Sequence, residues 1–464
     1  MSAAGPVRTT CPYCGVGCGL RIAADGAIAG DPDHPANRGH LCAKTAALGE
    51  TLKAADRLLW PQIDGRRASW DEALDRIAGA FARTIAERGP DAIGLYVSGQ
   101  FLTEDYYVAN KLMKGFIGSA NIDSNSRLCM ASVAGDIRAF GEDIVPGCYE
   151  DIEAADLVVL VGSNAAWCHP VLYQRLAVAK EEARGGRIVV VSDCWPTDTT
   201  RYGDAVLPAA GWGEKNGTVT NSERRISRQR AFRPPPGEAR PDWWAICAVA
   251  RRLGWGAAFP YRRPVEIFRE HAALSAFENP GPRRRIFDIG ALAGLGDAEY
   301  DGLEPVQWPL PRGAPWSEAG GKRLFGDGRG FPTDDGRARL VPTPYRPLAE
   351  PADGERPWSL NTGRVRDQWH TMTRAGRVPR LMAHTGEPRL DMHPADAAAL
   401  GLMDGALVRM ESRHGATVLP VRLSPDQRCG EVFAPMHWTD RFTSAGPIDR
   451  VVGAAIDPFP ASRS

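Results

Sequence analysis

The sequence predicts an α/β protein with a cysteine-rich N-terminal domain, doubly wound α/β segments in the middle and a β-barrel at the C-terminal end. Three observations support this prediction. Four cysteines fall within the first 42 residues, residues 156–193 have the pattern of strand, helix and strand, and residues 358–440 alternate as β-strands do. With 464 residues, of which 43% are apolar, the chain is long enough for about three domains.

The composition excludes several classes of protein. Lys+Arg and Asp+Glu both number 56, and this zero net charge argues against a nucleic-acid partner. No apolar run approaches the ~18–20 residues that span a bilayer, so no membrane association is expected. Residues 1–10 hold neither an apolar segment nor a twin arginine. The prediction is a cytoplasmic protein whose cysteines do not form structural disulfides.

The N-terminal cysteines have the spacing C-x2-C-x3-C-x23-C. Cys11, Cys14 and Cys18 share one glycine-rich loop, and Cys42 follows alone. Structural zinc sites usually use two short C-x2–4-C pairs. A single loop with three thiolates instead suits three corners of a cubane cluster. The pattern therefore favours a 4Fe–4S cluster, with zinc and unligated thiols as alternatives.

Local signals place the elements that follow. Ser69-Trp-Asp-Glu72 is a capping box, which predicts the start of a helix. Residues 92–97 are predicted to form a buried strand, and residues 101–117 a helix after it. Residues 157–191 are expected to form a strand–helix–strand unit, and ligands bind at the carboxyl ends of such strands. Alternation within residues 407–422 places two strands in the expected barrel.

Several motifs occur in one order along the chain. After the cysteine loop come SGQFLTEDYY from Ser98, NSRLCM from Asn125, GCYEDI from Gly147, GTVTNSERR from Gly217 and NTGRVRDQWH from Asn361. Together they resemble the molybdopterin oxidoreductases of the dimethyl-sulfoxide-reductase type. Within that family the match is best to the catalytic subunits of assimilatory nitrate reductases, and it covers residues 8 to about 458.

The resemblance implies two cofactors. One is a 4Fe–4S cluster whose ligands are Cys11, Cys14, Cys18 and Cys42. The other is a molybdenum bis(molybdopterin guanine dinucleotide) centre, with Cys129 as the thiolate on the metal and Met130 beside it. Lys44 matches the relay lysine between cluster and pterin. The positions that match cofactor-contacting residues are Gln100, Asn125, Gly162, Ser163, Asn164, Ser192, Asp193, Lys215, Asp242, Thr362, Gly363, Arg364, Trp369, His370 and Thr371.

The activity that the resemblance implies is the reduction of nitrate to nitrite. Electrons would enter the cluster one at a time and pass Lys44 on their way to molybdenum. The implied partners are nitrate and an electron donor, either ferredoxin or an NADH-dependent flavoprotein. Formate dehydrogenase is the alternative within the family. Those enzymes place His after the metal-binding residue, whereas this chain has Met130 there.

The chain also departs from the family. After the strand at residues 187–191 relatives continue through a long further segment, whereas here the sequence runs directly into residues that match a later strand. The chain also stops before the family's final strand. We therefore expect incomplete doubly wound domains, two strands merged at residues 188–193, and an exposed apolar sheet edge. A cluster-bearing remnant that does not hold the full pterin centre is the competing hypothesis.

These inferences give four expected domains. Residues 1–57 would form the iron–sulfur domain, and residues 58–193 an α/β segment with the metal-ligating Cys129 and the βαβ unit. Residues 194–345 would form a second α/β segment and a linker. Residues 346–464 would form the pterin-binding β-barrel.

Overall fold

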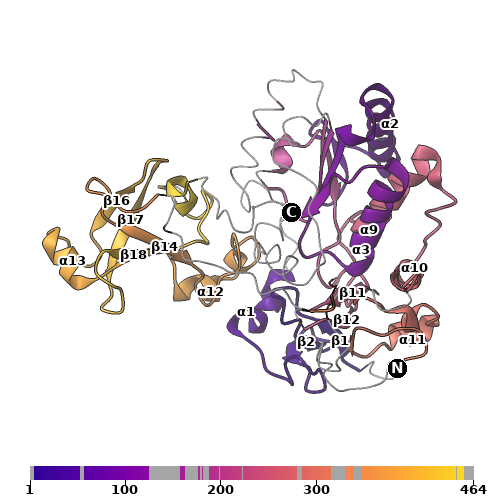
Figure 1. The fold of residues 1–464 in the computed structure, drawn as a ribbon, viewed down its shortest axis with the longest axis horizontal. Helices are drawn as coiled ribbons and strands as arrows, with labels where there is room; N and C mark the ends of the chain where they lie inside the picture. Colours follow the sequence, from indigo (N-terminus) through magenta and orange to yellow (C-terminus); the bar gives the residue numbers. More distant parts are fainter. Residues whose placement is uncertain are drawn as a thin grey trace. The chain divides into compact units, whose positions relative to one another are not determined.

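The computed structural model describes the chain in separate stretches. They are residues 5–52, 57–124, 157–161, 188–197, 199–221, 223–279, 285–314, 350–445 and 447–453, together with residues 176, 177, 180, 331, 333, 335–337 and 347. The chain divides into two compact units (Figure 1). The first comprises Met1–Leu41 with Ala54–Val341, and the second Cys42–Lys53 with Pro342–Ser464.

The first unit begins with a small antiparallel sheet of three strands. They are β1 (Val7–Thr10), β2 (Gly19–Ile22) and β3 (Ile28–Gly30). The turn between β2 and β3 lies at Asp25-Gly26, and Gly26 has a φ of 84°, which favours glycine. The connection between β1 and β2 is the cysteine loop, residues 11–18. Because Thr10 pairs with Gly19, the first strand pair holds both ends of that loop together.

A seven-stranded sheet forms the centre of the first unit. Its order is β5-β4-β10-β9-β8-β6-β7. Its strands are β4 (Gln62–Ile63), β5 (Arg66–Arg67), β6 (Ile93–Val97), β7 (Ile122–Ser124), β8 (Leu157–Val161), β9 (Ile188–Asp193) and β10 (Ala205–Pro208). The strands β10, β9, β8, β6 and β7 run parallel to one another. Strand β4 pairs antiparallel with β10, and β5 pairs antiparallel with β4.

Strand β9 lies where the sequence predicted two merged strands. It pairs in parallel with β8 on one side and with β10 on the other. All residues of β8 and β10 are buried, and so are the described side chains of β9, 189–193. The expected apolar edge at this position is therefore wrong for the described strands. A single strand with a partner on each side leaves no edge to expose.

Three helices cover one face of this sheet (Figure 1). Helix α2 (Trp70–Arg88) begins as predicted, since the Ser69 hydroxyl accepts a hydrogen bond from the backbone N–H of Glu72 at 3.1 Å. Helices α3 (Thr103–Asn110) and α9 (Asp242–Ala250) each continue as a π-helix. The described part of the unit also contains α10 (Pro264–Ser275), α11 (Asp297–Asp301), β11 (Gly217–Thr220), β12 (Arg225–Gln229) and β13 (Val306–Gln307).

The second unit is built on a five-stranded mixed sheet. Its order is β14-β18-β15-β17-β16, with β14 (Ser359–Gly363), β15 (Leu390–Met392), β16 (Leu407–Glu411), β17 (Ala416–Leu423) and β18 (Glu431–Pro435). Its helices are α1 (Ala43–Ala46), α12 (Pro379–His384) and α13 (Pro394–Ala399).

The predicted β-barrel is not what the described residues form, because β14 and β16 are the open edges of this sheet. Alternation of apolar and polar residues predicts one buried face. It does not distinguish an open sheet from a closed one.

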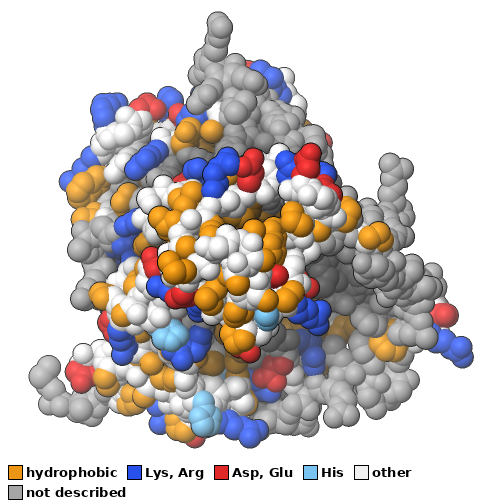
Figure 2. All heavy atoms as spheres, turned by 90° about the vertical axis from the view of Figure 1, so that its left-hand side faces the viewer, with side chains coloured by type: hydrophobic (Ala, Val, Ile, Leu, Met, Phe, Trp, Pro, Cys, Tyr) orange, Lys and Arg blue, Asp and Glu red, His pale blue; other side chains and the backbone are white. Residues whose placement is uncertain are grey.

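Exposed apolar side chains occur on the second unit, including Leu400, Met403 and Leu407. Figure 2 faces this unit and shows hydrophobic side chains among charged ones over its surface. No helix in the described part of the chain is both long and apolar enough to cross a membrane.

Candidate functional site

The cysteine loop has a defined backbone. Its neck is closed by a hydrogen bond from the N–H of Cys11 to the carbonyl of Cys18 at 2.8 Å, and the N–H of Gly17 donates to Cys14 at 3.3 Å. Gly17 has a φ of 63°, which an L-residue adopts with strain. Cys11, Cys14 and Cys18 are not in disulfides. The loop therefore offers three thiols on one short, closed turn, which fits a cluster that takes one thiolate at each iron.

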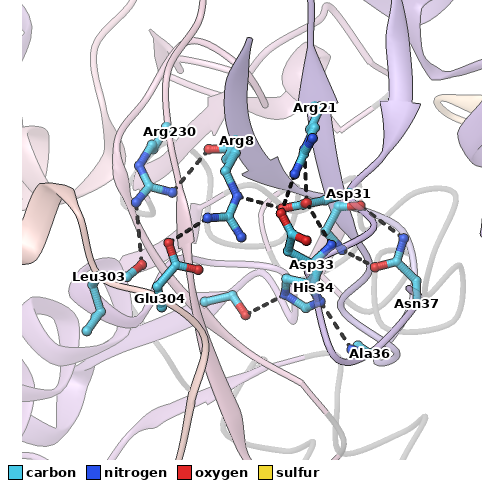
Figure 3. Close-up of polar contacts among 12 residues, drawn as sticks. Arg8, Arg21, Asp31, Asp33, His34, Ala36, Asn37, Arg230, Leu303 and Glu304 are labelled. Atoms are coloured by element: carbon cyan, nitrogen blue, oxygen red, sulfur yellow. Dashed lines mark hydrogen bonds and ion pairs between the residues drawn. The ribbon is translucent and has the colours of Figure 1, made fainter. Parts of the chain in front are cut away.

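Ion pairs to the buried carboxylate of Asp31 hold the hairpin that carries this loop (Figure 3). The Asp31 carboxylate, which is 2% exposed, accepts from Nε of Arg8 at 2.6 Å and from Nε of Arg21 at 3.0 Å. Burial would raise the pKa of Asp31, but the hydrogen bond and charge of Arg8 outweigh it and lower that pKa. Arg8 also pairs with Glu304, and Arg230 donates to the Arg8 carbonyl. The hairpin is thereby attached to the rest of the first unit.

His34 packs directly beneath the residue that follows Cys18. A Cβ at Gly19 would lie 2.3 Å from the Cβ of His34, so only glycine fits there. The His34 Nδ1 accepts from the N–H of Ala36 at 3.2 Å, which leaves Nε2 to donate to the Ser227 hydroxyl at 3.0 Å. Burial lowers the pKa of His34, so the neutral ring serves as a structural link between the hairpin and β12.

The carboxyl end of β9 carries a buried polar cluster. The Ser192 hydroxyl donates to Oδ1 of Asp242 at 3.1 Å, and Nζ of Lys215 donates to Oδ2 of Asp242 at 2.7 Å and of Asp105 at 3.1 Å. Burial opposes the charge on Lys215, but the carboxylates of Asp105 and Asp242 raise its pKa. Asp193 accepts instead from the N–H groups that follow it in the chain. The structure thus brings together four predicted residues, Ser192, Asp193, Lys215 and Asp242, at the end of the strand where ligands bind.

A second ion pair lies in the same region and was not predicted. Both terminal nitrogens of Arg57 bond to the Glu214 carboxylate at 2.7 Å, and the two side chains are 4% and 1% exposed. Arg57 also donates to the carbonyls of Cys194 and Ala209. One signal in the sequence could have indicated Glu214: it immediately precedes Lys215, which was predicted as a site residue.

Glu104 is a fully buried carboxyl group in α3. It accepts from Tyr300 OH at 2.6 Å, from the Thr218 hydroxyl at 3.0 Å and from the Thr218 N–H at 2.9 Å. Burial raises the pKa of Glu104 to about 6. Its neighbour in sequence, Asp105, faces Lys215 instead. Both acids belong to the motif that begins at Ser98, and neither was predicted as a site residue.

Cys42 and Lys44 belong to the second unit. Cys42 precedes α1, and its sulfur lies 3.3 Å from the Thr45 hydroxyl. Burial raises the pKa of Cys42, but the hydrogen bonds with Thr45 outweigh it and lower that pKa. Nζ of Lys44 donates to the Arg366 carbonyl at 2.7 Å, which fixes the position of its charge. The adjacent Asp367 pairs with the Arg366 guanidinium.

The predicted residues Arg364, Trp369, His370 and Thr371 lie in a compact turn of the second unit, residues 364–371. The Arg364 guanidinium lies over the Trp369 ring at 4.6 Å, and the Trp369 and His370 rings are 4.4 Å apart. His370 has a φ of 45°. His437 joins the two ends of the turn, because its Nε2 accepts from the N–H of Val365 at 2.9 Å and its Nδ1 donates to the His370 carbonyl at 2.6 Å. Thr362 and Gly363 end β14 just before this turn.

Buried polar atoms in this unit lack partners. Within the described residues, Gln368 Oε1, Trp438 Nε1 and Thr439 Oγ1 are buried and make no hydrogen bond. Buried polar atoms in folded proteins are almost always hydrogen-bonded, so a buried atom without a partner is a candidate for contact with a ligand. These atoms are one acceptor, one donor and one hydroxyl that can do either.

Several predicted residues lie outside the described part of the chain. They are Asn125, Cys129, Met130, Gly162, Ser163 and Asn164. Gln100 is described, and it contacts the cysteine loop: its Nε2 donates to the Tyr13 carbonyl at 2.7 Å.

The domain families match this organisation in order. Residues 6–54 match the molybdopterin oxidoreductase Fe4S4 domain, residues 57–188 and 178–252 match the molybdopterin oxidoreductase family, and residues 359–464 match the Molydopterin dinucleotide binding domain. The chain therefore belongs to the molybdopterin oxidoreductases of the dimethyl-sulfoxide-reductase type. Its cofactors are a 4Fe–4S cluster and a molybdenum bis(molybdopterin guanine dinucleotide) centre.

Individual similar proteins indicate which type of oxidoreductase this chain is. The chain is 37% identical to a protein named nitrate reductase from Klebsiella oxytoca, over 97% of this chain and 77% of that protein. It is 30% identical to a nitrate reductase from Shewanella frigidimarina, over 98% and 76%. The fold is that of acetylene hydratase from Pelobacter acetylenicus, with a TM-score of 0.68, 16% identity and coverage of 95% and 94%. The chain is thus an oxidoreductase of the nitrate reductase type.

The same comparisons reveal a large internal difference. The Klebsiella alignment runs over 680 positions, whereas this chain has 464 residues, so at least 216 aligned positions have no counterpart here. The two matches to the molybdopterin oxidoreductase family overlap at residues 178–188. This overlap ends at Ile188, the first residue of β9.

Proposed function

We propose that this chain reduces nitrate to nitrite. The observation that carries the proposal is similarity to proteins named nitrate reductase over 97% and 98% of the chain. Met130, which follows the proposed metal ligand, supports nitrate over formate. Nitrate is then the substrate, and ferredoxin or an NADH-dependent flavoprotein the electron donor. The donor and a cytoplasmic location remain predictions from the sequence.

The proposed ligands divide between the two cofactors. Cys11, Cys14, Cys18 and Cys42 would bind the cluster, and Cys129 would bind molybdenum. When bound, these groups supply one-electron transfer and the abstraction of an oxygen atom from nitrate, respectively. Lys44, held by the Arg366 carbonyl, would keep one positive charge beside the electron path.

The remaining predicted residues would bind and orient the dinucleotides. Arg364 is held against Trp369, so its guanidinium is pre-oriented for a pyrophosphate. Lys215 already bonds to Asp105 and Asp242, and its charge is therefore balanced within the chain. We propose that this trio sets the shape of the strand end, while backbone N–H groups and Ser192 would meet the ligand.

Anaerobic purification followed by metal analysis and an activity assay tests the proposal. We expect about four iron atoms per chain, molybdenum, and nitrite formation with a reduced artificial donor. Cys129→Ser should keep the iron and lose nitrite formation, whereas Cys148→Ser, which matches no ligand position, should match the wild type. Unchanged activity in Cys129→Ser would exclude Cys129 from the site. Dye reduction with formate but no nitrite formation would favour the formate dehydrogenase alternative.

A second candidate is a cluster-bearing remnant without catalysis. The absence of at least 216 of the aligned positions favours it, because the resemblance to the family implies that part of a cofactor cradle lies in that segment. The same metal analysis separates the two. Iron near four per chain without molybdenum, even after expression with excess molybdate, would support the remnant and contradict the proposed activity.

A further inference from the structure

Side chains from distant segments bind the backbone carbonyls of the cysteine loop. Each donor comes from a different part of the first unit. The pairs are Trp212 Nε1 with Thr10 O, Gln100 Nε2 with Tyr13 O, Asn221 Nδ2 with Val16 O and Asn37 Nδ2 with Gly19 O, at 2.8, 2.7, 3.0 and 3.0 Å. These carbonyls flank or lie between the three cysteines, so the loop backbone is held along its length.

Asn37 holds the C-terminal end of the loop at two points. Its Oδ1 accepts from the N–H of Gly19 at 2.7 Å, and its Nδ2 donates to the carbonyl of the same residue and to that of His40 at 3.0 Å. The side chain is buried, and Gly19 directly follows Cys18. A carboxamide that satisfies both backbone groups of one residue acts like a strand partner and fixes the orientation of that residue.

Asn221 holds the middle of the loop. It donates to the Val16 carbonyl, and a Cβ at Gly17 would lie only 2.6 Å from the Asn221 Cβ. Its Oδ1 accepts from the N–H groups of Glu223 and Arg225. One carboxamide therefore shapes its own turn and contacts the cysteine loop at the point where only glycine fits.

Gln100 connects the loop to the central sheet. It lies just beyond the carboxyl end of β6, and its own N–H bonds to the Ser98 hydroxyl at 3.1 Å. In a trans peptide the carbonyl and the N–H point in opposite directions. Holding the Tyr13 carbonyl toward Gln100 therefore directs the N–H of Cys14 away from Gln100.

We propose that Asn37, Gln100 and Asn221 are positioning residues that shape the cysteine loop before the cluster binds. Their amide N–H groups hold the carbonyls of Tyr13, Val16 and Gly19 toward the protein. A carbonyl oxygen that pointed at the cluster would disfavour the addition of an electron to it. This inference rests on the proposed ligation by Cys11, Cys14 and Cys18. It predicts that removing one of these side-chain hydrogen bonds weakens retention of the cluster and lowers its reduction potential, while the rest of the unit stays folded.

The experiment uses the purified full chain with its cluster. Gln100→Leu is the first variant, because Gln100 is exposed and leucine keeps most of its bulk. We expect iron extraction by a chelator to accelerate about three- to tenfold, as for the loss of one hydrogen bond. The cluster's reduction potential should fall, and the melting temperature of the chain should not change. Gln100→Lys restores a donor and should recover slow extraction.

Asn37→Ala should accelerate extraction more than Gln100→Leu, because it also leaves the Gly19 N–H unpaired. Asn279 provides the matched control. Its carboxamide accepts from the N–H of Arg285 at 2.6 Å and donates to the carbonyl of the same residue at 3.1 Å. Asn279→Ala loses the same pair of side-chain-to-backbone hydrogen bonds at a place outside the cysteine loop. It should therefore keep wild-type extraction and potential.

Two results would overturn the inference in different ways. An iron-loaded wild type with unchanged extraction and potential in Gln100→Leu and Asn37→Ala would exclude the positioning role alone. A wild-type chain that binds no iron after anaerobic reconstitution would remove the proposed ligands and this inference with them.

Discussion

The cysteine loop of the first unit and the turn at residues 364–371 of the second differ in how their polar groups are bonded. Carbonyls of the cysteine loop accept from Trp212, Gln100, Asn221 and Asn37. Near the other turn, in the described residues, buried atoms of Gln368, Trp438 and Thr439 make no hydrogen bond. The backbone of the cysteine loop is held by protein donors, although the Thr10 hydroxyl just before it is also buried without a hydrogen bond. The second region has three such side-chain atoms among its described residues.

This difference follows from how the two cofactors are held. A cluster is bound by covalent metal–thiolate bonds, so the protein must shape the backbone behind the sulfurs. A dinucleotide is bound largely by hydrogen bonds, so the protein must keep donors and acceptors available. Cys14→Ser and Thr439→Val test the two sides of this comparison, and Lys215→Met and Glu104→Gln test two buried polar groups elsewhere in the first unit. In order of decreasing expected effect they are Cys14→Ser, Lys215→Met, Glu104→Gln and Thr439→Val.

Cys14→Ser should cause the largest change, because it removes a thiolate from the centre of a loop that is already shaped. We expect the broad visible absorbance and most of the iron to be lost on anaerobic purification. Cys429→Ser, at an exposed cysteine that matches no ligand position, is the control. Full iron content in Cys14→Ser would rule out this ligand.

Lys215→Met tests whether the polar cluster at the end of β9 is balanced within the chain. The substitution leaves Asp105 and Asp242 buried without their cation, and breaking a buried pair in this way costs about 3–5 kcal/mol. Urea denaturation should show that loss in the free energy of unfolding. Arg67→Ala breaks the exposed pair with Glu238 and the contact of Arg67 with the Trp60 ring, and should cost less than about 2 kcal/mol. Equal losses would mean that the Lys215 pair is not buried in solution.

Glu104→Gln tests the charge state of the buried acid in α3. The pKa of Glu104 is raised from 4.5 to about 6, so the folded state binds its proton more tightly than the unfolded state does. Its stabilising contribution is therefore complete below pH 4.5 and is lost as the pH rises to about 6. The loss is about 2 kcal/mol. Glu104→Gln should flatten the stability profile between these pH values. An unchanged profile would assign the pH dependence to other groups.

Thr439→Val should have the smallest effect on folding. The Thr439 hydroxyl is buried and bonds to no described group, so its replacement by a methyl group of the same shape should change stability by less than about 0.5 kcal/mol. If the hydroxyl instead binds the dinucleotide, less guanine nucleotide should be released per chain on acid treatment. A clear loss of stability with full nucleotide content would give Thr439 a structural role.

Local signals in the sequence were enough for much of the fold. The capping box at Ser69 predicted the start of α2, and alternation predicted β16 and β17. Each of these features depends on residues close together in the chain, so a short window contains the necessary information. The cysteine spacing and ordered motifs likewise identified the family without three-dimensional information.

Other features depended on tertiary structure. Alternation predicted strands but not whether the sheet closes, since closure depends on pairing between β14 and β16, which are far apart in sequence. The merged strand was predicted, but only its two parallel partners showed that β9 is not an edge.

Residue types and their order along the chain were enough to predict the cofactors, because the chemistry of thiolates at cluster spacing and of the family motifs is specific. How these residues are supported became visible only in the folded structure. Asn37, Gln100 and Asn221 meet the cysteine loop from separate segments, and Lys215 meets Asp105 from 110 positions away. Ligand identity is a property of single side chains, whereas support comes from contacts that the chain makes only when it folds.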